Sequence, residues 1–163
     1  IERTNIFAPQ FLTMKKYILS VGLAAILMMP SCKEDPTTTD LLTDGGWNIE
    51  TLTINPSITI NGVVITDYYS QLYDYDKDNI LTFYSDGTYT SDEGALKEHP
   101  SDPQTKQGNW LLSASEDRIT VYVAQDTAVY TLASISEDAL TLIYSERDSA
   151  TQINYSFTAG FTH

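Results

Sequence analysis

The sequence predicts an all-β fold: an eight-stranded antiparallel up-and-down barrel with a small hairpin insert. From Trp47 onward, apolar and polar residues alternate with period two in segments rich in Thr, Tyr, Ile and Val. This alternation is typical of strands with one buried face. Short polar breaks separate the segments, and short connections favour antiparallel neighbours that pair in sequence order. Eight strands in such a meander close most economically into a barrel, because closure removes both sheet edges.

The expected strands are short and evenly spaced. The segment Ser85-Asp86-Gly87 predicts a tight hairpin turn, because glycine adopts the positive φ that other residues resist. In the fifth expected strand, Ile119, Val121 and Val123 share one face. The eight strands are Trp47–Ile54, Ile80–Tyr84, Thr88–Asp92, Asn109–Ser113, Arg118–Val123, Ala128–Ile135, Ala139–Ser145 and Gln152–Thr158.

Three further segments fill the gaps between these strands. Ile58–Ile65 predicts a small hairpin around an Asn-Gly turn. Asp67–Tyr73 has the composition of one or two helical turns. Gly94–Gln107 contains two prolines and few apolar residues, so it is expected to be the longest loop, at one mouth of the barrel.

The first 31 residues have the features of a secretion leader. Met14–Ser31 combines two lysines with an apolar stretch, residues 17–29, which at 13 residues is too short to span a bilayer as a helix. We therefore expect a helical signal peptide over 14–31. Residues 1–13 lie upstream of a natural start at Met14 and are interpreted as a spurious extension outside the fold.

Cys32 follows the apolar stretch directly after a small residue, which resembles the lipobox of bacterial lipoproteins. The resemblance implies a lipid-bearing Cys32, membrane attachment through that lipid, and an unfolded tether over residues 32–43, which are rich in Pro and Thr. An ordinary cleaved signal with an incidental cysteine is the alternative. Lys33-Glu34-Asp35 resembles a lipoprotein surface-export signal and favours the outer leaflet of the outer membrane over the periplasmic leaflet.

The charge of the chain narrows the range of partners. From Cys32 onward there are 6 Lys and Arg against 21 Asp and Glu, a net charge of −15. Such a surface repels phosphate backbones, so nucleic acid is not an expected partner. Cys32 is the only cysteine, so neither an intramolecular disulfide nor a Cys-based zinc site can form. We expect a single barrel domain over residues 44–163, acting as a monomer.

An ordered set of short motifs resembles the lipocalin-like domains of secreted lipoproteins from one phylum of Gram-negative bacteria. The resemblance implies an eight-stranded barrel that is open at one end and usually has no assigned activity. Members of that family often carry two cysteines where this chain has Tyr75 and Glu98, so its long loop is expected to be looser. The motifs are Gly46-Trp47, Ile60-Asn61-Gly62, Thr66-Asp67-Tyr68, Asp76–Phe83, Asp86–Tyr89, Asp92-Glu93-Gly94, Asp102–Thr105 and Gly108-Asn109-Trp110.

The residues offer little for catalysis or metal binding. Asp74, Asp76 and Asp78 imitate the first half of a calcium loop, but the glycine and the bidentate glutamate of such a loop are missing. An acidic turn without metal is the favoured interpretation. Neither His99 nor His163 is expected to be fixed by a partner, as a catalytic histidine must be. The sequence thus predicts no enzyme and no cofactor.

Aromatic residues with polar tips are the most informative part of the composition, with eleven tyrosines and two tryptophans. Such side chains suit a cavity for an amphipathic or sugar-like ligand, although core packing would also explain them. The pocket candidates are Tyr89, Trp110, Tyr122 and Tyr144, whereas Trp47 is expected to plug the base. Two hypotheses follow: an envelope lipoprotein that binds a small apolar or glycan-like ligand, or an interaction module whose barrel is filled by side chains.

Overall fold

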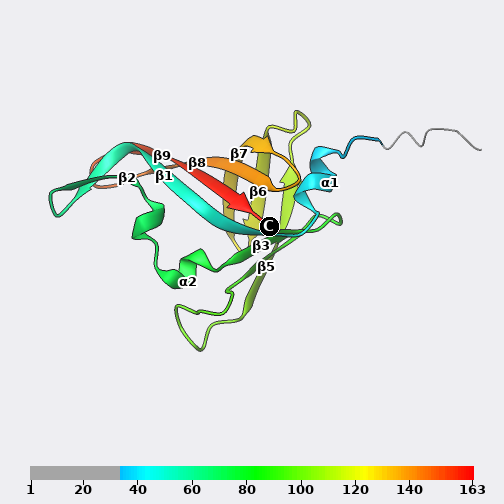
Figure 1. Cartoon of the computed structure of the whole chain (residues 1–163), viewed down its shortest axis with the longest axis horizontal. Coiled ribbons are helices and arrows are strands. Elements are labelled where there is room, and N and C mark those ends of the chain that lie inside the picture. Colours follow the sequence, from blue (N-terminus) through cyan, green and yellow to red (C-terminus); the bar gives the residue numbers. More distant parts are fainter. Residues whose placement is uncertain (1–33) are drawn as a thin grey trace, which may run out of the picture. The chain divides into compact units, whose positions relative to one another are not determined.

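The computed structural model describes residues 34–163, and Pro36–His163 forms one compact unit. The predicted signal peptide and Cys32 lie outside the described residues. Strands dominate the compact unit, with three short helical segments beside them (Figure 1). In chain order the elements are α1 (Thr38–Leu42), β1 (Gly46–Ile60), β2 (Val63–Asp67), the 3₁₀ helix η1 (Tyr69–Gln71), α2 (Asp74–Lys77), β3 (Ile80–Phe83), β4 (Thr88–Asp92), β5 (Thr105–Leu112), β6 (Arg118–Val123), β7 (Asp126–Ile135), β8 (Ala139–Arg147) and β9 (Asn154–Thr162).

The sheet closes on itself. From β3 to β9 each strand pairs antiparallel with the next, β1 pairs with β3, and β1 also pairs with β9. Strands β1 and β3 to β9 therefore form a closed eight-stranded barrel, and β2 is an extra strand on the outer part of β1. The predicted fold class is confirmed: an up-and-down meander of eight strands is the lipocalin arrangement.

The hairpin insert is continuous with the first barrel strand. The sequence predicts a strand ending at Ile54 and a separate hairpin, but β1 runs unbroken to Ile60 and serves as the first arm of that hairpin. The turn between β1 and β2 is made by Asn61 and Gly62, whose φ angles are +51° and +82°. Positive φ at both positions fits the tight hairpin turn that an Asn-Gly pair favours. In Figure 1 this hairpin projects away from α1.

A short helix seals one end of the barrel, where an unfolded tether was expected. The tether prediction is wrong for residues 38–42, which form α1. Its start is capped reciprocally by Thr37 and Asp40, a capping box that the Thr-rich composition concealed. Leu42 is fully buried and its carbonyl accepts a hydrogen bond from Trp47 Nε1 at 3.1 Å. The ring of His163 lies 3.9 Å from that of Trp47, so both ends of the domain meet at this base.

The core fills the barrel from this base upward. Its fully buried large side chains come from α1, β1, β3, β6 and β8, and they pack around the barrel axis. Because this core and the closed sheet lie entirely within Pro36–His163, that unit has what an independently folding domain requires. The side chains in question are Leu42, Trp47, Phe83, Ile119 and Leu140.

Removing the α1 seal should destabilise the barrel. We expect Leu42→Ala to lower the free energy of unfolding by about 2–5 kcal/mol, because Leu42 is fully buried. Leu111→Ala deletes the same atoms from an outward-facing side chain that is 61% exposed, and should change stability by no more than about 0.5 kcal/mol. Urea unfolding of both variants measures this. Equal effects would contradict the role assigned to α1.

Candidate functional site

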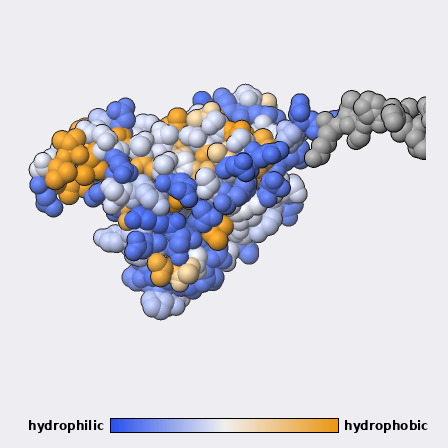
Figure 2. Space-filling model, in the orientation of Figure 1, coloured by the Kyte–Doolittle hydropathy of each residue, from blue (hydrophilic) through white to orange (hydrophobic). Residues whose placement is uncertain are grey.

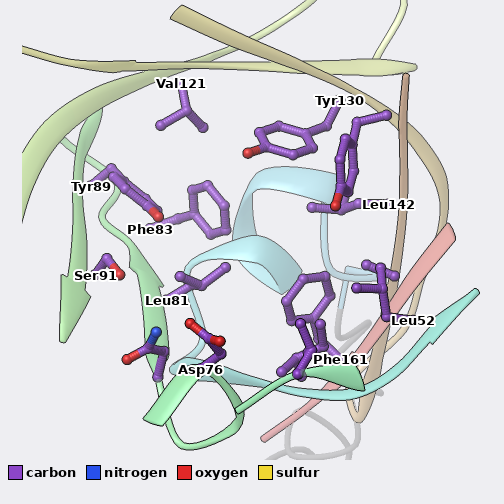
Figure 3. Close-up of a pocket in the computed structure, with 15 residues that line it drawn as sticks. Leu52, Asp76, Leu81, Phe83, Tyr89, Ser91, Val121, Tyr130, Leu142 and Phe161 are labelled. Atoms are coloured by element: carbon purple, nitrogen blue, oxygen red, sulfur yellow. The ribbon is translucent and has the colours of Figure 1, made fainter. Parts of the chain in front are cut away.

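Above the filled base the barrel contains a cavity of about 350 Å³ (Figure 3). Most of its wall is aliphatic or aromatic. Its polar groups are few: three tyrosines, Asp76, Asn79 and Ser91. The complete lining is Ile49, Leu52, Leu72, Asp76, Asn79, Leu81, Phe83, Tyr89, Ser91, Val121, Tyr130, Leu142, Tyr144, Ala159 and Phe161.

Three tyrosines contribute both ring surface and hydroxyl groups to this wall. Tyr130 and Tyr144 meet edge to face with ring centroids 5.8 Å apart, and Tyr144 stacks on Phe157 at 4.9 Å. Burial raises the pKa of Tyr89 and that of Tyr144 to about 12, and it also raises the pKa of Tyr130. All three phenols are therefore neutral at physiological pH. Each can donate or accept one hydrogen bond within a mostly apolar wall.

The remaining polar groups lie at the end of the barrel opposite α1. Asp76 belongs to α2, Asn79 comes directly before β3, and Ser91 lies near the end of β4. Figure 3 shows Asp76 and Ser91 on the far side of the cavity from Val121 and Tyr130. Asp76 Oδ2 accepts from the Tyr73 amide at 3.3 Å, and Asn79 Oδ1 is buried without a hydrogen-bond partner. This end of the cavity thus combines two acceptors, the Asp76 carboxylate and the unpartnered Asn79 Oδ1, with the Ser91 hydroxyl and the Asn79 NH2 group, which can donate.

Two of the four predicted ligand contacts are in the cavity wall and two are not. Tyr89 and Tyr144 line the cavity, as expected. Tyr122 does not: Val121 faces inward, so its neighbour on β6 faces outward and is 43% exposed. Trp110 faces inward but packs edge-on against Phe83 at 5.4 Å and donates from Nε1 to the Tyr84 carbonyl at 2.9 Å. It belongs to the packed core near the β3–β4 turn.

Sequence reasoning missed the other polar residues of the site. Ser91 follows Tyr89 by two positions on β4, so strand alternation alone places the two on one face. Asp76 and Asn79 carry no such signal, because they reach the cavity only through the path of η1 and α2 over the mouth. Tyr130 shares the inward face of β7 with Leu132, a pattern that could have identified it.

The acidic turn does not assemble a metal site. Asp74 pairs with Lys77 at 3.6 Å, Asp76 faces the cavity, and Asp78 Oδ2 accepts from the amides of Ala95 and Leu96 at 2.8 Å each. The three carboxylates therefore have separate surroundings. Within residues 34–163, no group of three or more His, Cys, Asp or Glu side chains is arranged to hold a metal ion.

The Asp78 contacts also bear on the long loop. β5 begins at Thr105, so the loop is shorter than the predicted Gly94–Gln107. Asp78 holds the first part of the loop against the acidic turn. The last part is held against the end of β4, because Gln104 Nε2 donates to Asp92 Oδ1 at 2.8 Å. Hydrogen bonds thus connect the acidic turn to the start of the long loop.

An apolar cluster lies on the outer surface, away from the cavity. Ile60, Val63 and Val64 at the tip of the β1–β2 hairpin are 40%, 59% and 65% exposed. Figure 2 shows apolar residues gathered at this projecting end, on a surface that is otherwise largely polar. We call these three residues the hairpin tip.

A family model described as a domain of unknown function, DUF5004, matches residues 30–162. The chain belongs to the DUF5004 family. No curated protein matches this DUF5004 chain. Among solved structures it is similar to a deswapped triple mutant of bovine odorant binding protein, with 14% identity, a TM-score of 0.40, and coverage of 73% of this chain and 72% of that one. A complex of bovine odorant binding protein with a selenium-containing odorant has the same identity and TM-score, covering 80% and 74% of the two chains.

The strand order of the DUF5004 domain itself supports the lipocalin-like part of the sequence resemblance. In the part of the chain that the structure describes, no helix combines the length and apolar character needed to cross a bilayer.

The buried tyrosines should make the DUF5004 domain sensitive to alkali. Their neutral forms are favoured in the folded state, where the pKa rises from 10.0 to about 12 for Tyr89 and Tyr144. The resulting stability is complete below pH 10 and is lost as pH rises towards about 12. We expect the Tyr89→Phe, Tyr144→Phe double variant to lose less stability across this interval. Urea unfolding at a series of alkaline pH values measures it, and an unchanged pH dependence would contradict the assignment.

Proposed function

We propose that this protein binds a small apolar or amphipathic molecule inside its barrel, and that lipid on Cys32 holds it at the cell envelope. The cavity is the observation that carries the binding proposal. Its volume of about 350 Å³ falls within the range of small-molecule sites, roughly 300–1,000 Å³. An apolar wall with a few polar groups gathered at one end is the composition typical of such sites.

The wall chemistry favours an apolar body over a glycan. Side chains such as Leu52, Leu81, Phe83 and Phe161 offer no hydrogen bonds, so a sugar placed among them would leave hydroxyl groups unpaired. Hydrocarbon or aromatic parts of a ligand carry no such penalty, and their burial is favourable at about 25 cal/mol per Å². The glycan-like alternative therefore has less support than the apolar one.

We propose binding without catalysis. The cavity lining contains no histidine, cysteine or lysine, and its single carboxylate, on Asp76, accepts a hydrogen bond from the Tyr73 amide rather than from the Ser91 hydroxyl. Acid–base and nucleophilic mechanisms require such paired groups within hydrogen-bonding reach of each other.

The envelope part of the proposal rests on the sequence. A basic start, a short apolar stretch and a small residue before Cys32 are the signals that support lipidation, and Lys33-Glu34-Asp35 favours the outer surface. The compact unit begins at Pro36, four positions after Cys32, so a lipid on that cysteine would place the barrel close to the bilayer. Two or three acyl chains at about 0.8 kcal/mol per methylene make a lasting anchor.

Filling the cavity should abolish ligand binding. We expect Leu142→Trp, whose side chain would extend into the cavity, to weaken binding of a fluorescent naphthylamine probe by at least about tenfold. Leu111→Trp makes the same substitution on the outer surface and should bind the probe as the unaltered domain does. Circular dichroism checks that both variants are folded. Equal binding by both would place the probe outside the barrel and overturn the cavity assignment.

Probe binding should also stabilise the fold by mass action. At a free probe concentration of about 100 times its Kd, the free energy of unfolding should rise by about 2.7 kcal/mol. Thermal unfolding with and without the probe measures this effect, which Leu142→Trp should abolish.

Cys32→Ala should abolish lipid attachment. In cells given radioactive palmitate, the unaltered protein should carry label and sediment with membranes. The variant should show neither, because no other cysteine is available. A variant that still carries label would refute the assignment of Cys32.

The hairpin tip supports a second candidate function, an interaction module that docks on another envelope protein. Exposed apolar residues clustered on a polar surface often mark protein contacts. A photoreactive residue at Val63 should then form an adduct with one envelope protein in cells, whereas the same residue at the outward-facing Thr131 should not. Absence of any adduct specific to Val63 would count against this function.

A further inference from the structure

The charges around the cavity are acidic. Asp76 is in the lining, and Glu146 on β8 is close enough for its charge to raise the pKa of Tyr130 and that of Tyr144, after the larger effect of burial. Glu146 also shares the strand face of Leu142 and Tyr144, because residues two positions apart on β8 point the same way. One carboxylate, on Asp76, thus lies in the cavity wall, and a second, on the exposed Glu146, adds negative charge near Tyr130 and Tyr144.

No positive charge balances them inside. The described residues include five Lys and Arg side chains, and none lines the cavity. Lys77 of α2 turns to Asp74 and lies over the ring of Tyr69, 5.3 Å from its centroid. Arg147 alternates with Glu146 and therefore points to the outer face of β8. Lys97 donates to the Asp102 carbonyl at 2.9 Å, and Arg118 lies at the start of β6, near the base.

Lys106 is the one cation placed on the inner face near the mouth. It pairs across β4 and β5 with Ser91, which lines the cavity, so both side chains point to the same side of the sheet. However, Lys106 Nζ lies 2.8 Å from Oε1 of the buried Glu93, so its charge is neutralised. Because Lys106 and Glu93 neutralise each other, the cavity lining keeps the uncompensated negative charge of Asp76.

The donors that the lining offers at the polar end are neutral: the Ser91 hydroxyl and the Asn79 amide. Asp76 can only accept hydrogen bonds when ionised, and Asn79 Oδ1 is a buried acceptor without a partner. A ligand donor could satisfy that oxygen after a rotation of the amide. A carboxylate at this place would bring a third acceptor and a like charge, and burying a charge without an opposite partner is strongly unfavourable.

We infer that the cavity selects amphiphiles whose head group donates hydrogen bonds and is neutral or positively charged, an alcohol or an ammonium group, and that it rejects carboxylates with the same chain. This inference rests on the proposed function, since it specifies the ligand class of the same cavity. The head group would lie beside Asp76, Asn79 and Ser91, with the apolar chain directed towards Val121 and Phe83.

Three ligands that share a ten-carbon chain test the inference. Decylamine, decanol and decanoate would each displace the naphthylamine probe from the Pro36–His163 unit near neutral pH, where the amine is protonated and the carboxylic acid is ionised. We expect the amine and the alcohol to bind at least about tenfold more tightly than decanoate. Equal binding of the three, or tighter binding of decanoate, would overturn the inference and leave cavity binding intact. If none of the three, nor the probe itself, binds inside the barrel, the proposed function fails first.

A matched pair of variants locates the selectivity. Asp76→Asn should reduce the preference for decylamine over decanol by about fivefold, because it removes the carboxylate while keeping a similar shape. Asp74→Asn changes the net charge equally in the same helix α2, but its side chain is 87% exposed and faces Lys77. It should leave the preference unchanged. An equal effect of both variants would attribute the selectivity to the overall charge of the domain and refute the cavity assignment.

Discussion

The pairing of β1 with β9 is the constraint on which the rest of the structure depends. Seven residue pairs, from Asn48 with Thr162 to Asn55 with Ser156, join the first strand to the last. Without them the sheet would have two open edges and no enclosed interior. The seam is also tight: a Cβ atom on Gly160 would lie 2.5 Å from Thr51 Oγ1, so a larger residue here would require the Thr51 side chain to move.

Closure creates an interior, and the size of its side chains divides that interior into a filled half and a hollow half. Trp47, Ile119 and Leu140 are buried in the half next to α1 and do not line the cavity. The cavity wall includes small side chains such as Ala159 and Ser91, which leave space inside the barrel, and the rings of three tyrosines. The same closed sheet therefore encloses a packed core at one end and a cavity at the other.

The sequence was sufficient to predict the barrel, because period-two alternation and short polar turns are local signals that the closed sheet preserves. The sequence was insufficient where one strand pairs with several others. β1 serves three neighbouring strands along its length, which no local pattern reveals. The helix α1 was missed because its stability comes from burying Leu42 under the barrel rather than from helix propensity.

The candidate site shows the same division between local and tertiary information. Tyr89 and Tyr144 lie in the cavity wall, whereas Tyr122 faces outward, because its neighbours Ile119 and Val121 occupy the inward face of β6. Asp76 could not be assigned in advance, because its position depends on how η1 and α2 cross the mouth. The alternation of side chains along a strand thus predicts which residues face the interior of the barrel. The position of η1 and α2 over its mouth is known only from the tertiary structure.

The plug formed by α1 leaves the opposite end of the barrel as the route into the cavity. Leu42 is fully buried in this plug, and the rings of Trp47 and His163 lie against each other beside it. A molecule in the cavity would therefore exchange with the surroundings past η1 and α2. The rate of that exchange would depend on these two short segments, although neither belongs to the barrel wall.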